Sequence, residues 1–332
     1  MLRRLAPFVA CLLSLAAAPA VAPAAPVGNP MAQAPWWVDP TWGAARTAAD
    51  LRDQGLPDDP AMSLIGAQPY ARWFVAASPP AALRRELDSA SADGRMAVFA
   101  VHGLPHPMCT GDPTPGHADA ASYRDWIDSY AVVVGDHPAV VVVEPDELAA
   151  ASCLTPAWRA ERITLVAYAV RTFAALPRTG VYIDVGAGDW LNLRKAASLL
   201  RRADVADARG FALNATHFDW TSNEVAYGHR LSRLVGGKHF IVNTAMNGRG
   251  PLVTRTGFHV WCNPSGRALG PLPTVRTGDR LVDAFFWLIE PGLSSGTCRG
   301  GPHVGTFWQA WASQLYAAST GAPDFPLFAR RR

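Results

Sequence analysis

The feature that most constrains the fold is a repeated alternation of short apolar runs with longer segments of helical periodicity. The runs contain few polar residues, so we expect strands that are buried on both faces, as in parallel sheets. Repeated strand and helix units of this length predict a parallel sheet. The predicted strands are residues 72–76, 96–101, 139–143, 180–183, 210–213, 239–242 and 284–288.

The clearest helical segments between these runs are residues 121–134, 156–176 and 190–202. The second begins with Thr155 as a candidate N-cap and Pro156 at the first helical position, a favoured arrangement at helix N-termini. About seven such units predict the α/β class and a closed or nearly closed (β/α) barrel of about seven parallel strands. An open doubly wound sheet would give the same alternation, but no glycine-rich phosphate loop supports its dinucleotide-binding version.

The N-terminus has the layout of a secretory signal peptide. Arg3 and Arg4 precede an apolar stretch over residues 5–18, which small residues follow. The stretch is shorter than the roughly 20 apolar residues that span a bilayer, and no later segment is long and apolar enough. We expect a secreted, extracellular protein with a signal peptide over residues 1–25, a flexible leader over 26–35 and a single folded domain over 36–332.

Composition fits one globular domain and argues against a nucleic-acid partner. Hydrophobic residues make up 49% of the 332 residues and charged residues 17%, enough for one large core. Loss of Arg3 and Arg4 with the signal peptide would lower the formal net charge from +3 to +1. A chain so close to neutrality has no feature of a nucleic-acid or polyanion binder.

Four cysteines remain once Cys11 leaves with the signal peptide, and export would place them in an oxidising compartment. We expect two disulfides, for which four cysteines allow three connectivities. A zinc site is the alternative, but no pair has C-x-x-C spacing and secretion disfavours it. We predict no metal ion and no cofactor; the four cysteines are Cys109, Cys153, Cys262 and Cys298.

Polar side chains gather just after the predicted strands, which in a barrel is the catalytic face. Glycoside hydrolysis needs a protonated acid for the leaving oxygen and a second group that activates water or attacks carbon. Asp146 and Asp184 are the obvious candidates, although an aspartate after a strand also often caps the next helix. The polar residues of this rim are His102, Glu144, Asp146, Asp184, Asn214, Thr216, His217, Asn243, Asn247 and Glu290.

Tryptophan is unusually frequent, with 12 residues, and several lie outside the predicted strands. Indole faces can stack on the C–H faces of pyranose rings, so tryptophans near the rim would suit a sugar-binding cleft. Packing in the core is the commoner fate of a large aromatic side chain. The tryptophans outside the strands include Trp36, Trp37, Trp190, Trp220 and Trp261.

Several long motifs, in the same order, resemble glycoside hydrolase family 6, the inverting endoglucanases and cellobiohydrolases that hydrolyse β-1,4-glucan. The similarity extends from about Trp37 to Tyr316. It implies a distorted barrel with fewer strands than the usual eight and a β-glucan or another polysaccharide or oligosaccharide as partner, and we expect a monomer. The motifs are VVVEPDELAAASC at 141–153, VYIDVGAGDWL at 181–191, RGFALNAT at 209–216, WCNPSGRALG at 261–270 and SSGTCRGGP at 294–302.

The resemblance implies a role for individual residues. Asp146 falls on the family's general acid, whose raised pKa would keep its proton near neutral pH. Asp184 falls on an aspartate that helps to order the site. The resemblance also implies stacking of sugar on two tryptophans, and the full set of predicted substrate-binding residues is Trp37, Trp73, Trp190, Asn214 and Trp261.

The resemblance further implies a disulfide pairing. Cys109 would pair with Cys153, and Cys262 with Cys298. Each bridge closes a loop of several tens of residues, which contributes roughly 3 to 4 kcal/mol on the chain-entropy model. Both bridges would brace loops over the cleft.

Several polar cleft residues of the family are replaced in this sequence. The family's Y-x-(I/L)-P-x-R-D-C reads HGLPHPMC at residues 102–109, and its W-I-K-x-P-G-E-S-D-G reads WLIEPGLSSG at residues 287–296. Its D-x-G-H becomes DVGA at 184–187, and its D-T-S-R-N-G becomes NTAMNG at 243–248. Loss of one positioned acid or base usually costs about 10² to 10⁴ in rate, so these changes predict an eroded active site with weak or altered activity.

Two functions therefore compete. The first is a secreted family 6-like glucanase that hydrolyses β-1,4-glucan or a related glycan with inversion, in which His102, Asp189 or Glu290 serves as a substitute base. The second is a catalytically inactive glycan-binding protein on the same scaffold. Replacing Asp146 with asparagine would abolish turnover in the first case and leave glycan binding intact in the second.

Overall fold

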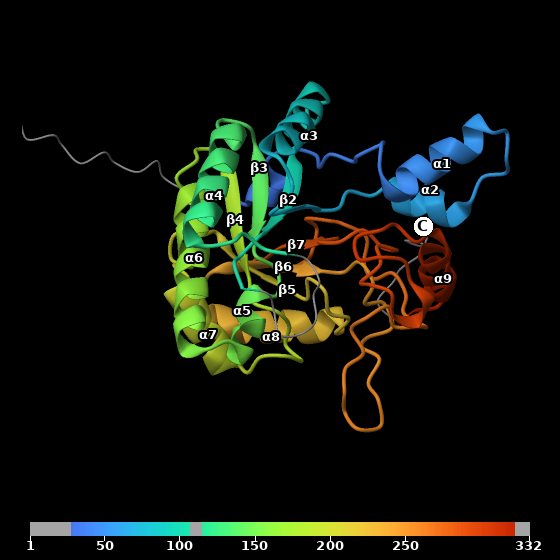
Figure 1. Cartoon of the computed structure of the whole chain (residues 1–332). Helices are drawn as coiled ribbons and strands as arrows, with labels where there is room; N and C mark the ends of the chain where they lie inside the picture. The colour runs from blue at the N-terminus through green and yellow to red at the C-terminus, as the bar shows by residue number, and fades with distance from the viewer. Residues whose placement is uncertain (1–27, 107–114, 323–332) are drawn as a thin grey trace, which may run out of the picture.

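The computed structural model describes residues 28–106 and 115–322. Within these residues, seven strands form one sheet in the order β1-β2-β3-β4-β5-β6-β7, and every neighbouring pair is parallel. This is the distorted α/β barrel that the sequence predicted (Figure 1). The strands are β1 (Arg72–Val75), β2 (Ala97–His102), β3 (Ala139–Val143), β4 (Thr179–Asp184), β5 (Gly210–Leu213), β6 (His239–Asn243) and β7 (Val282–Phe286).

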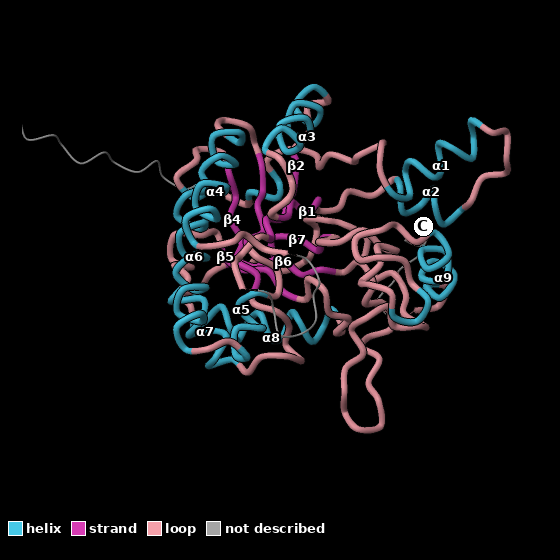
Figure 2. The backbone as a smooth tube through the Cα atoms, viewed as in Figure 1, coloured by secondary structure: helices cyan, strands magenta, loops and turns pink. Residues whose placement is uncertain are grey.

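The two edges of the sheet approach each other where β7 ends and β1 begins. The backbone N–H of Ala71 donates to the carbonyl of Trp287 at 2.8 Å, and Tyr70 pairs with Trp287 in an isolated parallel bridge. These contacts are far fewer than a full strand ladder would make. The sheet is therefore curled but incompletely closed, with its strands in the centre and helices around them (Figure 2).

The predicted strand boundaries agree with the structure to within one residue at each end, except at β7. The predictions for β3 and β5 match residue for residue, whereas β7 was predicted over 284–288 and runs over Val282–Phe286. The strand starts earlier because it includes Asp283, a buried carboxylate that breaks the apolar run. It ends earlier because the N–H of Leu288 donates to the side chain of Asn243 at 2.9 Å instead of continuing the ladder.

Among the described residues, five helices pack on the outer side of the sheet, and three others form a separate layer beside it (Figure 1). Helix α7 begins at Leu193 rather than at the predicted residue 190, because the side chain of Asn192 accepts from the N–H of Lys195 and caps it. No helix in the described residues is long and apolar enough to cross a bilayer. The outer helices are α3 (Pro80–Ala92), α4 (Ala120–Val134), α6 (Pro156–Ala174), α7 (Leu193–Arg202) and α8 (Thr221–Leu234), and the separate layer is α1 (Gly43–Asp53), α2 (Pro60–Gly66) and α9 (Gln309–Ser319).

The segment that we predicted to be a flexible leader belongs to the folded body from residue 28 onward. Met31, in the short helix η1 (Pro30–Ala32), is 1% exposed and packs with the side chains inside the barrel. Pro30 lies so close to Gly180 that a Cβ on the glycine would be 2.6 Å from the proline Cβ. The segment is ordered because it fills the end of the barrel, where a void would lose packing contacts. The predicted signal peptide lies outside the described residues.

A carboxylate inside the barrel links strands that are not neighbours. Asp283 on β7 accepts from the Tyr182 hydroxyl on β4 at 2.7 Å. It also accepts from Nε and Nη2 of Arg209, which precedes β5, at 2.8 and 2.9 Å. Nδ1 of His239, at the start of β6, lies 3.1 Å from the same carboxylate. Asp283 therefore fixes the mutual positions of β4, β5, β6 and β7.

We expect Asp283→Ala to lower the free energy of unfolding by roughly 3 to 5 kcal/mol, because it leaves a partly buried guanidinium and a buried phenol without their acceptor. Urea denaturation would measure the loss. Asp88, whose side chain is 59% exposed, provides the matched control, and Asp88→Ala should change stability by less than about 0.5 kcal/mol. A loss below about 1 kcal/mol for Asp283→Ala would show that water replaces the carboxylate and that the linkage is weak.

Candidate active site

Asp146 lies at the carboxyl end of the barrel and is held by three neighbouring strands. It follows β3, has a left-handed backbone with φ of 67° and precedes the short helix α5 (Glu147–Ala150). Its N–H donates to Oδ1 of Asp184, which ends β4, at 2.8 Å. Thr216, which follows β5, donates its hydroxyl to Oδ2 of Asp146. The backbone and the carboxylate of Asp146 are thus both positioned, and the residue lines a cleft.

Asp184 supports Asp146 from below the cleft. It is fully buried, and its Oδ1 also accepts from the N–H of Gly186 at 2.9 Å. Burial raises the pKa of the Asp184 carboxyl well above its usual range, and the neighbouring Asp146 carboxylate raises it further, against the opposing effect of the two N–H donors. The Asp146–Asp184 pair therefore retains a proton at pH values where two isolated aspartates would both be ionised.

A third buried carboxylate, that of Glu144, lies beside the Asp146–Asp184 pair. Glu144 is 0% exposed, accepts from the Tyr123 hydroxyl at 2.9 Å and accepts from the N–H of Gly103 at 3.1 Å. Burial raises the pKa of Glu144. His102 lies between two acids, with Nδ1 3.9 Å from Glu144 and Nε2 3.8 Å from Glu147. His102 lines the cleft, but both of its ring nitrogens face carboxylates beneath it.

Glu290 caps a helix rather than standing free in the cleft. Its Oε1 accepts from the N–H of Ala44, at the start of α1, at 2.7 Å. The close approach requires glycine at position 43, where φ is +52° and a Cβ would lie 2.0 Å from the carboxylate oxygens. Glu290 is 2% exposed, and this burial raises its pKa to about 7.

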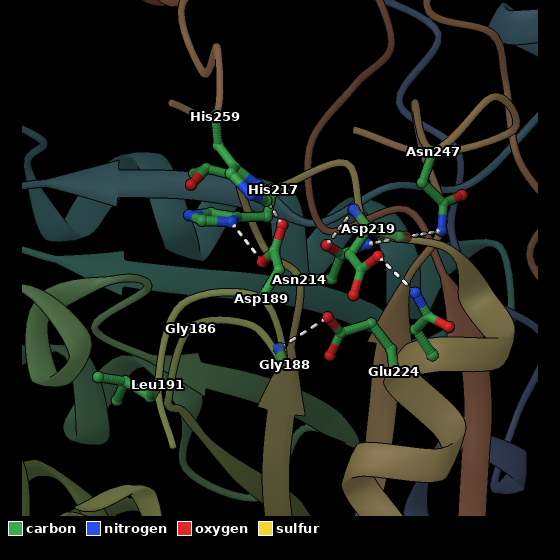
Figure 3. Close-up of polar contacts among 12 residues, drawn as sticks. Gly186, Gly188, Asp189, Leu191, Asn214, His217, Asp219, Glu224, Asn247 and His259 are labelled. Atoms are coloured by element: carbon green, nitrogen blue, oxygen red, sulfur yellow. Dashed lines mark hydrogen bonds and ion pairs between the residues drawn. The ribbon is translucent and has the colours of Figure 1, made fainter. Parts of the chain in front are cut away.

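Asp189 is held between two imidazoles from different loops (Figure 3). Its Oδ1 lies 2.9 Å from Nδ1 of His217, and its Oδ2 lies 2.8 Å from Nδ1 of His259. Burial alone would raise the pKa of Asp189, but the two imidazoles lower it overall. Burial alone would lower the pKa of His217, but Asp189 raises it overall. This ionic cluster lies in the cleft wall next to Asp146.

The structure separates the predicted sugar-binding residues into two groups. Trp73, Trp190 and Trp261 line the cleft, whereas Trp37 packs against the outer core. Asn214 is 0% exposed, and its side chain donates to the carbonyls of Asp219 and Asn243. Asn214 and Trp37 are not among the residues that line the cleft, so their predicted contact with a glycan stays a prediction that the structure does not support.

Sequence reasoning missed one cleft tryptophan. Trp42 is 39% exposed and lines the cleft, with the Arg72 guanidinium 5.2 Å from its ring centroid. Its position in the tryptophan-rich stretch of residues 36–42 was the only available signal. The cleft has a volume of about 1400 Å³, large enough for several sugar rings.

A disulfide ties together two loops of the cleft wall. Cys262 and Cys298 are bonded, with their Cα atoms 6.3 Å apart, as the resemblance implied. Trp261 and Thr297, the neighbours of the two cysteines, both line the cleft. Cys109 lies outside the described residues, so its pairing with Cys153 stays a prediction.

Two clusters of the described residues bring three metal-ligand side chains within 4.8 Å of one another: His102 with Glu144 and Glu147, and Asp189 with Asp219 and Glu224. In the first, Glu147 already pairs with Arg162. In the second, burial raises the pKa of Asp219 and of Glu224, so that protons can take the place of a cation. We assign a metal to neither cluster.

The chain is similar to known cellulases along most of its length. A family model described as glycosyl hydrolases family 6 matches residues 31–319. Endoglucanase A of Thermobispora bispora is 35% identical over 283 residues, and Endoglucanase A of Cellulomonas fimi is 32% identical over 284 residues. These matches cover 81% and 84% of this chain, but only 59% and 60% of the two relatives.

Solved structures agree with these matches. The endoglucanase Cel6 from Mycobacterium tuberculosis, in complex with a methyl-cellobiosyl-4-deoxy-4-thio-β-D-cellobioside, has a TM-score of 0.83 and 38% identity, over 88% of this chain and 100% of that one. The catalytic core of the cellobiohydrolase Cel6A from Chaetomium thermophilum has a TM-score of 0.75 at 23% identity, over 88% and 99% of the two chains, and supports the fold alone.

The position of Glu290 predicts how stability depends on pH. A carboxyl whose pKa is raised from 4.5 to about 7 in the folded protein binds more protons when folded, so its stabilising contribution is complete below about pH 4.5 and is lost as the pH rises through about 7. Glu290→Gln cannot ionise but can still accept from Ala44. The free energy of unfolding of Glu290→Gln, measured relative to the wild type by urea denaturation, should rise by roughly 1 to 3 kcal/mol between about pH 5 and pH 8.

The matched control is Glu161→Gln, because the Glu161 side chain is 38% exposed. Its stability should stay within about 1 kcal/mol of the wild type at every pH, because its contact with His106 at 3.0 Å is partly exposed to solvent. Parallel pH profiles for the wild type and Glu290→Gln would show that Glu290 ionises in the folded protein without penalty.

Proposed function

The chain belongs to glycosyl hydrolases family 6, and we propose that it hydrolyses β-1,4-glucan or a related glycan with inversion, using Asp146 as the general acid. The observation that carries the proposal is the arrangement of Asp146, Asp184 and Thr216, which holds Asp146 in the wall of a cleft lined with tryptophans. The relatives named endoglucanase, and the similar structure with a bound thio-linked cello-oligosaccharide, support glucan as the substrate class.

In this mechanism Asp146 protonates the glycosidic oxygen as the bond from that oxygen to the sugar's anomeric carbon breaks. A water molecule attacks the same carbon from the opposite face and passes its proton to a base about 6.5 to 9.5 Å from the acid. Asp184 does not touch the substrate. It fixes the backbone of Asp146 by accepting a hydrogen bond from its N–H.

We further propose that this activity is weak or altered, because each substitute base already has a structural partner. His102 faces Glu144 and Glu147, and Glu290 caps α1. Asp189 has a lowered pKa, which keeps it ionised but makes it a weaker base, and both of its oxygens contact imidazoles. Ile289 and Leu293 line the cleft where the family carries lysine and glutamate, which adds apolar surface in place of charge.

The same observations favour a second candidate function, glycan binding without catalysis. Trp42, Trp73 and Trp261 line the cleft, and Trp261 is 40% exposed. Such indoles offer stacking surfaces for sugars whether or not a base is present. The two candidates differ in one respect, which is the requirement for an ionisable side chain at position 146.

We expect purified protein to release reducing sugar from soluble β-1,4-glucan, and Asp146→Asn and Asp146→Ala to lower the rate about 10²-fold to 10⁴-fold, because each removes the proton donor. Asp88→Asn is the matched control and should retain the full rate. Binding of cello-oligosaccharides by calorimetry is measured on the same proteins.

Equal rates for the wild type and the Asp146 variants would contradict the role of Asp146. Absence of turnover in all of them, with oligosaccharide binding intact, would replace hydrolysis with the binding function. Turnover of another glycan alone would keep the mechanism and change the substrate.

We also propose that the protein is secreted after cleavage between residues 20 and 25, and that Cys109 pairs with Cys153. N-terminal sequencing and peptide mapping of the exported protein under non-reducing conditions would check both. A mature chain that still begins at Met1, or a peptide with a free Cys153 thiol, would contradict them.

A further inference from the structure

One cleft tryptophan has its face covered by another ring of the protein. The imidazole of His217 lies parallel to the indole of Trp190, with ring centroids 4.8 Å apart and an interplanar angle of 12°. Both residues line the cleft. A pyranose that stacked on this indole face would need the space that the imidazole fills.

The imidazole is fixed by contacts from separate loops. Oδ1 of Asp189, between β4 and α7, is hydrogen-bonded to Nδ1 of His217 at 2.9 Å. Nδ1 of His259, in the long loop between β6 and β7, lies at ion-pair distance, 2.8 Å, from the other oxygen of Asp189, and Figure 3 shows both imidazoles converging on this carboxylate. The His217 side chain is only 17% exposed. Rotating it out of the stack would break the contact with Asp189.

The indole itself has little freedom to move away. The backbone N–H of Trp190 donates to the carbonyl of Ala187 at 3.0 Å, which fixes the main chain that carries the indole. Gly186 packs against the benzo ring so closely that a Cβ there would lie 3.0 Å from Cε3 of Trp190. Trp190 and His217 therefore form a fixed pair rather than a mobile contact.

We propose that His217 determines chain-length specificity by occupying the stacking surface of Trp190, which shortens the cleft on that side of Asp146. The proposal rests on the proposed function, since it assumes that the cleft binds a glycan chain. Trp261, at 40% exposure, keeps an accessible indole elsewhere in the lining of the cleft. The cleft then binds short and long oligosaccharides with similar affinity, because the additional sugar rings of a long chain make no contact with Trp190.

The first test needs no ligand. Oxidation by N-bromosuccinimide, mapped by mass spectrometry of peptides, reports the accessibility of each indole separately. In the wild type, Trp190 should react much more slowly than Trp261, and in His217→Ala its rate should rise several-fold. The matched control is His137→Ala, which removes a histidine just before the amino end of β3. In this variant the oxidation of Trp190 should stay slow. A Trp190 rate that is equal in the wild type and His217→Ala would overturn the proposal.

The second test measures binding in an Asp146→Asn background, so that hydrolysis does not interfere. Calorimetry would compare cellotriose with cellohexaose. His217→Ala should tighten cellohexaose about three- to tenfold, the gain expected from one aromatic stacking contact, and leave cellotriose unchanged. Adding Trp190→Leu to His217→Ala should remove this gain in affinity for cellohexaose. Trp190→Leu alone should leave the affinity for cellohexaose unchanged.

The outcomes separate this proposal from the proposed function. Weaker binding of cellohexaose by Trp190→Leu alone would show that the indole already contacts sugar, and would overturn the proposal while supporting a glycan cleft. If no variant binds any oligosaccharide, the glycan cleft fails and with it the role of His217 in specificity, even if the oxidation test shows that the indole is covered. His217→Asn provides a second, smaller replacement if His217→Ala does not fold.

Discussion

The hydrogen bonds of Asp283 hold the barrel in its curled form. They connect β7 with β4 and with the residues that precede β5, although β4 and β7 are separated by two strands in the sheet. A flat sheet would place these strands roughly 14 Å apart at the usual spacing of about 4.8 Å. Two of the strands that Asp283 links, β4 and β5, carry at their carboxyl ends Asp184 and Thr216, which hold Asp146. The position of the acid therefore depends on a contact deep inside the barrel.

The strands could be predicted from sequence where apolar residues run without interruption. The run AVVVV of β3 was identified to the residue, because all five side chains are buried. The start of β7 was missed, because its ion-paired aspartate looks like a strand boundary until its partners are known. The leader was predicted to be flexible for a similar reason, because small residues and prolines surround Met31. The sequence alone does not show that the end of the barrel leaves a space into which Met31 packs.

The candidate site was predictable only in part. The resemblance located Asp146, Asp184 and one disulfide, because these residues lie within long motifs. It could not show that the amide of Asn214 is consumed by backbone carbonyls, that Trp37 faces the outer core, or that His217 covers Trp190. Each of these facts depends on which loop a side chain meets across the barrel. Local sequence contains no information on that choice.

The pairing of Glu290 with position 43 also restricts how the sequence can evolve. Any side chain at position 43 would collide with the carboxylate, and the helix would lose its capping acceptor if Glu290 became apolar. The two sites are 247 residues apart by their numbers, yet neither can change freely while the other is retained. A side chain at position 290 that turned toward the cleft would release the start of α1, so only residues that keep the acceptor, such as glutamine, can replace Glu290 without loss of the cap.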